Sequence, residues 1–149
     1  IDMAYKGKYK PKNRSKYKGD PTKIIYRSLW ERRFMVYCDE NPSIIKWASE
    51  EVVIPYRSPL DRRIHKYYPD FWVKTKKHDG LIEISLIEIK PKKQTVPPKD
   101  TGRKRKTGRF LLEMKRYGVN EAKWKAASAV CKKKNWKFVI LTEDQLLSK

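Results

Sequence analysis

The chain has 149 residues, and its 37 basic and 17 acidic side chains give a formal net charge of +20. A hydrophobic share of 39% excludes global disorder, and the length fits a single domain. No apolar run reaches membrane-spanning length, so the positive excess favours nucleic acid over a membrane surface as the partner.

Residues 1–23 are predicted to form a basic N-terminal arm. Ile1 and Asp2 precede Met3 and are interpreted as a cloning remnant. From residue 3 to residue 23, basic residues alternate with tyrosines and show no regular period, which is typical of an extended segment that is flexible without its partner. We expect this segment to contact nucleic-acid phosphates; the alternative is a solvated tail that packs on its own domain. The candidate phosphate contacts are Lys10, Lys12, Arg14 and Lys16.

One helix and three strands are predicted between residues 24 and 90. The helix runs from about Ser28 to Asp39, because aromatic side chains recur there at spacings of three and four residues and form one apolar stripe. The strands are short apolar or β-branched runs bounded by polar turns. They are predicted at Glu51–Tyr56, Tyr67–Val73 and Leu81–Lys90.

A basic loop, two helices and a last strand are predicted after residue 90. Residues 91–109 are rich in proline and glycine, and they carry a run of four cations. Gly118 is expected to separate two helices, with Asn120 as the N-cap of the second. These helices are predicted at Phe110–Tyr117 and Glu121–Lys133, and the strand at Trp136–Leu141. The order α-β-β-β-α-β places residues 24–149 in the α/β (α+β) class as one domain.

Two charged residues share one face of the strongest predicted strand, Leu81–Lys90. Side chains alternate between the faces of a strand, so Glu88 and Lys90 point to the same side as three apolar residues. A carboxylate and an ammonium near a core are costly unless they are paired or hold a metal. Asp70 is the only acid of the preceding strand, and a hairpin through Gly80 would bring it near Glu88.

Phosphodiester hydrolysis needs two carboxylates and a lysine in one place, and this chain supplies them as Asp70, Glu88 and Lys90. Two carboxylates bind a hard divalent cation, most naturally Mg²⁺, and the carbonyl of Ile89 is a natural third oxygen ligand. Such a metal polarises the phosphate and activates a water, while the lysine stabilises the developing negative charge. The alternative is an ordinary ion pair between Glu88 and Lys90 on a solvated strand face.

The same residues carry a resemblance to a known family. The pattern Glu31, Pro69-Asp70 and Glu88-Ile89-Lys90 is similar to that of the PD-(D/E)xK nuclease superfamily, which includes restriction endonucleases, phage junction resolvases and the cutting subunit of a Tn7-type transposase. The chain resembles the head completion proteins of T-even-like phages more closely, almost throughout from Met3. The segments that carry this second resemblance are 12–21, 26–31, 54–56, 87–91, 123–127 and 138–144.

The superfamily resemblance implies a restriction-endonuclease-like core, in which a mixed four-stranded sheet lies between helices. It also implies a double-stranded DNA substrate and Mg²⁺, with Mn²⁺ as a substitute, held by Asp70, Glu88 and the Ile89 carbonyl, with Lys90 catalytic. The phage resemblance implies action on packaged DNA during head completion, before the tail joins. Head or portal proteins are then expected partners, in the host cytoplasm or the virion, and the oligomeric state stays open.

Glu31 is a further candidate catalytic residue and metal ligand, because members of the superfamily often have an acid on the first helix. The segment from Ser28 to Glu31 also matches a capping box, in which Glu31 would accept a hydrogen bond from the backbone N–H of Ser28. Arg27, four residues before Glu31, is a possible ion-pair partner. The site and cap interpretations both stay open.

Cations after the third predicted strand are candidate DNA contacts. They are Lys92, Lys93, Arg103, Lys104, Arg105 and Lys106. Two functions compete with a metal-dependent endonuclease: a DNA-binding structural protein of the phage head or neck that does not cut, and a recombination nuclease that resolves DNA junctions. The presence of all three catalytic residue types favours the endonuclease.

Overall fold

The computed structural model describes residues 5–147, so the interpretation of Ile1 and Asp2 lies outside the described residues. The elements in chain order are β1 (Gly7–Lys8), the 3-10 helix η1 (Arg14–Lys16), β2 (Ile25–Tyr26), α1 (Leu29–Glu40), β3 (Ile44–Ser49), β4 (Ile54–Arg57), β5 (Ile64–Tyr67), β6 (Phe71–Lys76), β7 (Ile82–Ile89), the 3-10 helix η2 (Lys92–Gln94), α2 (Gly108–Lys134), β8 (Lys137–Leu141) and α3 (Glu143–Leu146).

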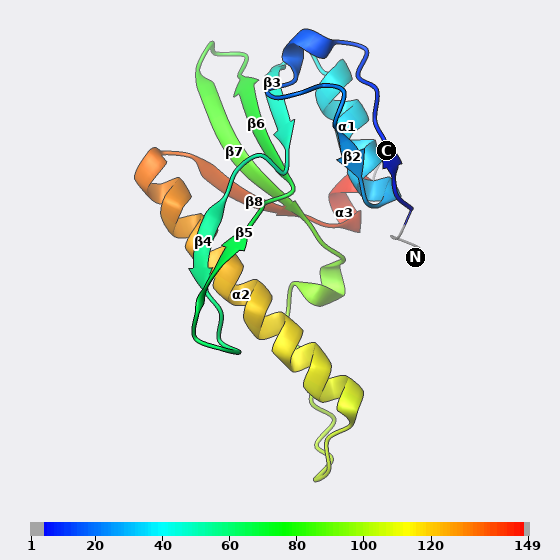
Figure 1. Cartoon of the computed structure of the whole chain (residues 1–149), viewed down its shortest axis with the longest axis vertical. Coiled ribbons are helices and arrows are strands. Elements are labelled where there is room, and N and C mark those ends of the chain that lie inside the picture. Colours follow the sequence, from blue (N-terminus) through cyan, green and yellow to red (C-terminus); the bar gives the residue numbers. More distant parts are fainter. Residues whose placement is uncertain (1–4, 148–149) are drawn as a thin grey trace.

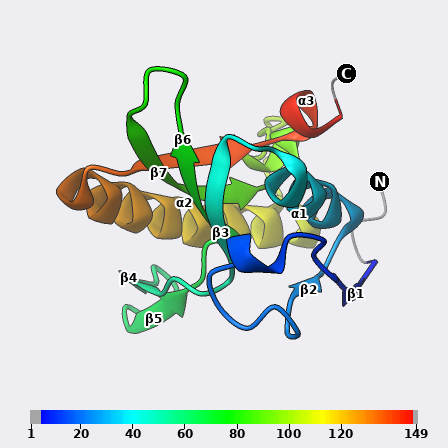
Figure 2. The same ribbon diagram turned by 90° about the horizontal axis from the view of Figure 1, so that it is seen from above.

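Four strands form the central sheet, in the order β3-β6-β7-β8. β6 is antiparallel to β3 and to β7, whereas β7 and β8 run parallel. Helix α1 covers one face of the sheet, and the long helix α2 crosses the other face (Figures 1 and 2). The mixed four-stranded sheet between helices, expected of a restriction-endonuclease-like core, is therefore confirmed.

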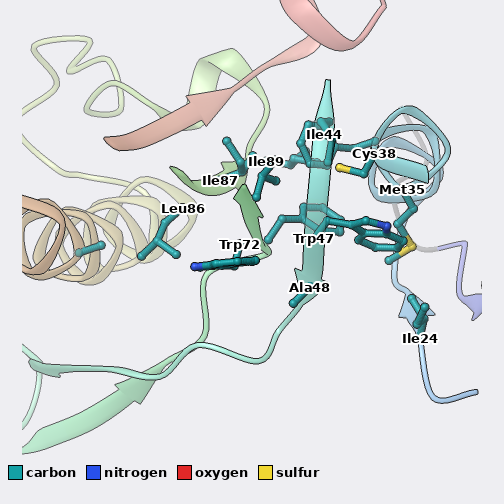
Figure 3. Close-up of a cluster of buried hydrophobic side chains, with 14 of the residues drawn as sticks. Ile24, Met35, Cys38, Ile44, Trp47, Ala48, Trp72, Leu86, Ile87 and Ile89 are labelled. Carbon is teal, nitrogen blue, oxygen red and sulfur yellow. The ribbon is translucent and has the colours of Figure 1, made fainter. Parts of the chain in front are cut away.

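The side chains of β7 alternate between two covered faces. Leu86 lies beside α2, whereas Ile89 lies on the side of α1 (Figure 3). Both are buried, with 0% and 5% of their surface exposed. This alternation places Glu88 on the α2 face together with Leu86, as the sequence predicted.

The first strand of the central sheet differs from the sequence-based prediction. The sheet uses β3, whereas the predicted strand Glu51–Tyr56 corresponds only in part to β4, which pairs with β5 in a separate hairpin. β3 has no alternating pattern because several consecutive side chains are buried, Trp47 completely. A period of two is the usual sign of a strand, so a short strand with both faces covered lacks it.

The second predicted strand is divided in two. β5 ends at Tyr67 and β6 begins at Phe71, and these strands belong to different sheets. Pro69 lies in the connection and is buried. Proline donates no backbone hydrogen bond, which favours a break in the strand at this point.

Helix α2 is one continuous element of 27 residues, so the prediction of two helices was wrong. Its N-cap is Thr107, whose hydroxyl accepts a hydrogen bond from the N–H of Phe110 at 3.1 Å. Asn120 lies inside the helix and is buried rather than capping it. A single glycine costs a helix only about 1 kcal/mol, which packing against the sheet and the β4–β5 hairpin outweighs at Gly118.

Residues 5–23 pack against the domain, so the prediction of a flexible arm was wrong for this part of the chain. Tyr9 and Tyr17 are buried, and both rings meet the ring of Trp47 edge to face. The hydroxyl of Tyr9 also donates a hydrogen bond to the buried carboxylate of Asp39, at 2.8 Å. Tyr9 and Tyr17 enter the core, while Tyr5 and most of the interspersed lysines stay in solvent.

Candidate active site

The start of β6 and the end of β7 lie side by side because the two strands are antiparallel. Their register pairs Phe71 with Ile87, so Asp70 reaches the last residues of β7. The Oδ2 atom of Asp70 accepts a hydrogen bond from the backbone N–H of Ile89 at 2.7 Å. The predicted proximity of Asp70 to the segment Glu88–Lys90 is therefore present in the fold.

Glu88 is a buried carboxylate, with 5% of its surface exposed. The indole N–H of Trp124 on α2 donates a long hydrogen bond to Glu88 Oε2, at 3.5 Å. The Nζ atom of Lys90 lies 4.0 Å from the same oxygen. Glu88 and Lys90 thus share a covered position rather than the solvated strand face of the alternative interpretation.

Asp70 lies close enough to other acids for their charges to act on it. Burial, followed by the negative charges of Glu88 and Glu31, raises the pKa of the Asp70 carboxyl well above its usual range. The hydrogen bond from Ile89 and the charge of Lys90 act in the opposite direction but are weaker. The fold therefore holds acidic groups together with less positive charge than they need, which suits a divalent cation.

A buried hydroxyl, that of Tyr67, lies next to the carboxylate of Glu88. Tyr67 is 4% exposed, and its hydroxyl has no hydrogen-bond partner among the described residues. Burial and then the charge of Glu88 raise the pKa of this hydroxyl. Buried hydroxyls are normally hydrogen-bonded, and the group that acts on this one as a hydrogen-bond partner is the Glu88 carboxylate, at a geometry short of a well-formed bond.

The oxygen groups that could hold an ion at this position are the carboxylates of Asp70 and Glu88 and the carbonyl of Ile89. In residues 5–147 no three His, Cys, Asp or Glu side chains gather closely enough to hold a metal ion. Ile89 adds an oxygen of a different kind, because the N–H and C=O of one strand residue point to the same neighbour. Its carbonyl therefore faces the side on which Asp70 lies.

Glu31 is in the first turn of α1 and is half-buried. Its backbone N–H donates to the hydroxyl of the N-cap Ser28 at 3.1 Å. Its carboxylate accepts longer hydrogen bonds, from the Ser28 hydroxyl at 3.3 Å and from the N–H of Arg27 at 3.4 Å. The return bond predicted from the Ser28 N–H is thus replaced by one from Arg27, while the charge of Glu31 still reaches Asp70.

The guanidinium of Arg27 pairs with Glu50 rather than with Glu31. Arg27 Nε and Nη2 lie 3.0 and 3.2 Å from the two carboxylate oxygens of Glu50. The backbone of Glu50 is left-handed, with φ 54°, and its N–H donates to the carbonyl of Asp70 at 3.1 Å. A non-glycine residue in this conformation is strained, and such strain is frequent where a site must be positioned.

The predictions from sequence included no site residue on α2. Trp124 contacts Glu88, and Lys123 beside it is half-buried, with Nζ 5.6 Å from the centre of the Tyr67 ring and 5.8 Å from that of Tyr56. The buried stripe of α2, at spacings of three and four residues, would have placed Trp124 against the sheet. Lys123 lies in segment 123–127, which carries the resemblance to the phage proteins, but no local pattern marks it as a site residue among the many cations of this chain.

A basic groove begins one helical turn from Trp124 and follows α2 toward its N-terminus. Its volume is about 590 Å³, and Asn120 marks the end nearest the carboxylates. Its cations are Lys93, Lys99, Arg109 and Arg116, and its acid is Glu113. A hollow of about 350 Å³ beside it includes Arg103, Arg105 and Lys106.

The predicted DNA contacts therefore lie in two separate regions. Lys93 and the run 103–106 lie at or near the groove, while the side chain of Lys92 pairs with Asp144 at 3.0 Å. Lys16 donates to backbone carbonyls at the C-terminal end of α1, and Lys12 pairs with Glu40 at 3.0 Å. These two cations lie at the opposite end of α1 from Glu31, with Lys10 and Arg14 as their chain neighbours.

Comparisons with known proteins agree with this fold and site. The family model for the N-terminal domain of TnsA-like endonucleases matches residues 41–143. The chain belongs to this endonuclease family, whose fold is restriction-endonuclease-like. It is also 47% identical, over 97% of its own length and 95% of the relative's, to the head completion nuclease of Enterobacteria phage T4. The search of solved structures gave no match.

These similarities support a nuclease role with DNA as substrate. Among the helices of residues 5–147, none has the length and apolar character that crossing a membrane requires.

Proposed function

We propose that this protein is a Mg²⁺-dependent endonuclease that hydrolyses phosphodiester bonds of double-stranded DNA. The observation that carries the proposal is the position of the Asp70 carboxylate, which accepts a hydrogen bond from the backbone N–H of Ile89. Ile89 is the residue between Glu88 and Lys90, so the three charged side chains lie together. The chain supplies there the two carboxylates and the lysine that this reaction uses. Family membership supports the same class of activity.

Asp70, Glu88 and the Ile89 carbonyl are the groups that would hold the metal. When bound, Mg²⁺ would polarise the scissile phosphate and lower the pKa of a water ligand. The hydrogen bond from Ile89 fixes the orientation of the Asp70 carboxylate, and Trp124 restrains Glu88 from the opposite element. Fixed orientation of both carboxylates reduces the reorganisation needed to form the ligand set.

Lys90 is the proposed charge-stabilising group. Its ammonium lies 4.0 Å from Glu88, and 28% of the side chain is exposed, so a substrate phosphate can approach it. Phosphodiester hydrolysis adds negative charge to the phosphate oxygens, and a nearby ammonium stabilises that charge more than it stabilises the substrate. Glu31 adds a negative charge beside Asp70 and is proposed to act on the metal through a water.

DNA is proposed to lie along the basic groove beside α2. Lys93, Arg109 and Arg116 line this groove, with Lys92 and residues 103–106 around it. Cations along a groove attract the phosphate backbone and release its counterions, independently of base sequence. The groove leads to the turn of α2 that contacts Glu88, which connects the binding surface with the carboxylates.

The relative's name suggests the biological setting. We propose that the chain acts in an infected host cell during completion of the phage head, where it trims packaged DNA before the tail joins. A head or portal protein would then be its partner. This part of the proposal rests on the similarity to the T4 head completion nuclease.

Plasmid cleavage tests the proposed activity. Wild type should nick or linearise supercoiled plasmid in Mg²⁺ or Mn²⁺ and leave it intact in EDTA. Glu88→Gln should abolish cutting, while Glu83→Gln, on the same strand but partly exposed and paired with Lys77 and Lys137, should cut as wild type does. Equal cutting by wild type and Glu88→Gln would identify a contaminating nuclease and favour a structural DNA-binding protein.

A further inference from the structure

We propose that Lys123 is a second active-site lysine, which contacts a non-bridging oxygen of the phosphate being cut. The proposal rests on the proposed nuclease function and assigns a substrate contact to helix α2. The neighbouring Trp124 contacts Glu88 through its indole N–H, which fixes this turn of α2 beside the carboxylates. Lys123 is thus placed at the site by the same helix contact.

Aromatic rings hold the Lys123 side chain in a partly desolvated position. Its Nζ atom is 5.6 Å from the ring centre of Tyr67 and 5.8 Å from that of Tyr56, and both tyrosines are buried. Two aromatic faces orient an ammonium by cation–π attraction without neutralising it. The side chain is thereby restrained beside the ring of Tyr67, whose hydroxyl interacts with Glu88.

The charge of Lys123 has no ion-pair partner among the described residues. Lys123 forms no ion pair within 4 Å with an acid among residues 5–147, whereas Lys90 lies 4.0 Å from Glu88. The charged groups that act on Lys123 are Glu88, Lys90 and Asp70, and burial lowers its pKa. A partly buried ammonium without an ion-pair partner is costly to keep, and an anionic substrate group would supply the missing charge.

The substrate provides that anion at the right place. A phosphate between the carboxylates and Lys90 presents two non-bridging oxygens, and its negative charge increases during hydrolysis. Lys90 lies at 4.0 Å from Glu88, whereas Lys123 has no carboxylate within that distance among residues 5–147, so its ammonium is available to one of these oxygens. The competing interpretation is purely structural: the ammonium only packs over two tyrosine rings.

Cleavage of a DNA duplex under single-turnover conditions separates these interpretations. Lys123→Gln and Lys123→Met keep much of the side-chain volume and remove the charge. Lys125→Gln is the control, because Lys125 is exposed on the same helix and pairs with Glu121. At saturating protein in Mg²⁺, both Lys123 variants should cut on the order of 10²-fold more slowly. Lys125→Gln should cut at the wild-type rate, and Lys123→Arg should keep part of the activity.

DNA binding in EDTA and thermal unfolding complete the test. Affinity of the Lys123 variants for the uncut duplex should change by less than about threefold, because one phosphate contact is a small share of the electrostatic attraction. Wild-type cutting rates in a folded Lys123→Gln or Lys123→Met would overturn the proposal, as would full recovery of the lost rate when a destabilised variant is assayed at lower temperature. Absence of cutting by wild type would overturn the proposed nuclease function, and the role of Lys123 with it.

Discussion

Among the side chains of the candidate active site, Asp70 carries the charge that folding disfavours most. Burial and the neighbouring acids raise its pKa above the value in the unfolded chain, which is about 3.9. The folded state therefore keeps its proton longer than the unfolded state does. Stability present below about pH 4 is lost as the pH rises through the raised pKa, as long as no metal is bound.

Asp70→Asn should stabilise the metal-free protein, and more so at higher pH. Asparagine keeps an acceptor for the Ile89 N–H but carries no charge. In EDTA, the melting temperature of the variant minus that of wild type should increase from pH 4 to pH 7. A difference that stays constant or shrinks with pH would show that Asp70 is not repelled by its neighbours. Mg²⁺ should raise the melting temperature of wild type and not that of the variant.

The charge of Glu31 is expected to matter for DNA cleavage more than its capping hydrogen bonds matter for stability. Those bonds are long, 3.3 and 3.4 Å, so Glu31→Gln should change stability by less than about 0.5 kcal/mol. Its cleavage rate should fall on the order of 10²-fold. Ser28→Ala is the matched variant: it removes the N-cap, should cost about 1 kcal/mol in urea unfolding, and should cut normally. Normal cutting by Glu31→Gln would show that Glu31 serves only as a helix-capping residue.

The core of the candidate site could be predicted from sequence, and its surroundings could not. The alternation of side chains along β7 and the single acid of the preceding predicted strand were enough to predict that Asp70, Glu88 and Lys90 lie together. The sequence offered Glu31 as a possible ion-pair partner of Arg27, but the partner in the fold is Glu50, at a strand end 23 residues away. Contacts of this kind depend on tertiary packing, which leaves no local pattern in the chain.

At the level of elements, the continuity of α2 is the clearest departure from the sequence pattern. The helix passes through Gly118, where an added Cβ would have its nearest neighbour, Pro59 Cγ, at 3.9 Å. Gly118→Ala should therefore raise the free energy of unfolding by about 0.5–1 kcal/mol. Gly7→Ala is the opposite control, because its Cβ would overlap the Tyr26 ring. A loss of stability in Gly118→Ala would indicate a break in the helix.

Element types were predicted better than their partners. α1, β7 and β8 occur close to their predicted bounds, because each has a strong apolar pattern. β3 was missed and β4 was assigned to the wrong sheet, because a fully covered strand and a hairpin edge both lack a clean alternation. Burial on both faces is a property of the assembled layers, so it is visible only in the fold.

For the whole molecule, the net charge of +20 does not identify which surface binds DNA. Combining Arg109→Gln with Arg116→Gln should reduce the slope of log affinity against log salt by about 2, one for each lost phosphate contact. Lys12→Gln with Arg14→Gln, beyond the C-terminal end of α1, should leave the slope unchanged. Binding is measured in EDTA to prevent cutting, and a reversed pattern would place DNA across the N-terminal segment instead of the groove. Deleting that segment would be uninformative, because Tyr9 and Tyr17 belong to the core.

Calorimetric titration with Mn²⁺ tests the central claim, that Asp70 and Glu88 hold a metal beside a lysine that serves the reaction. Wild type should bind Mn²⁺, Asp70→Asn and Glu88→Gln should lose that binding, and Lys90→Ala should bind at least as tightly as wild type while cutting roughly 10²–10⁴-fold more slowly. Unchanged Mn²⁺ binding in Asp70→Asn and Glu88→Gln, or no binding by wild type, would contradict the account.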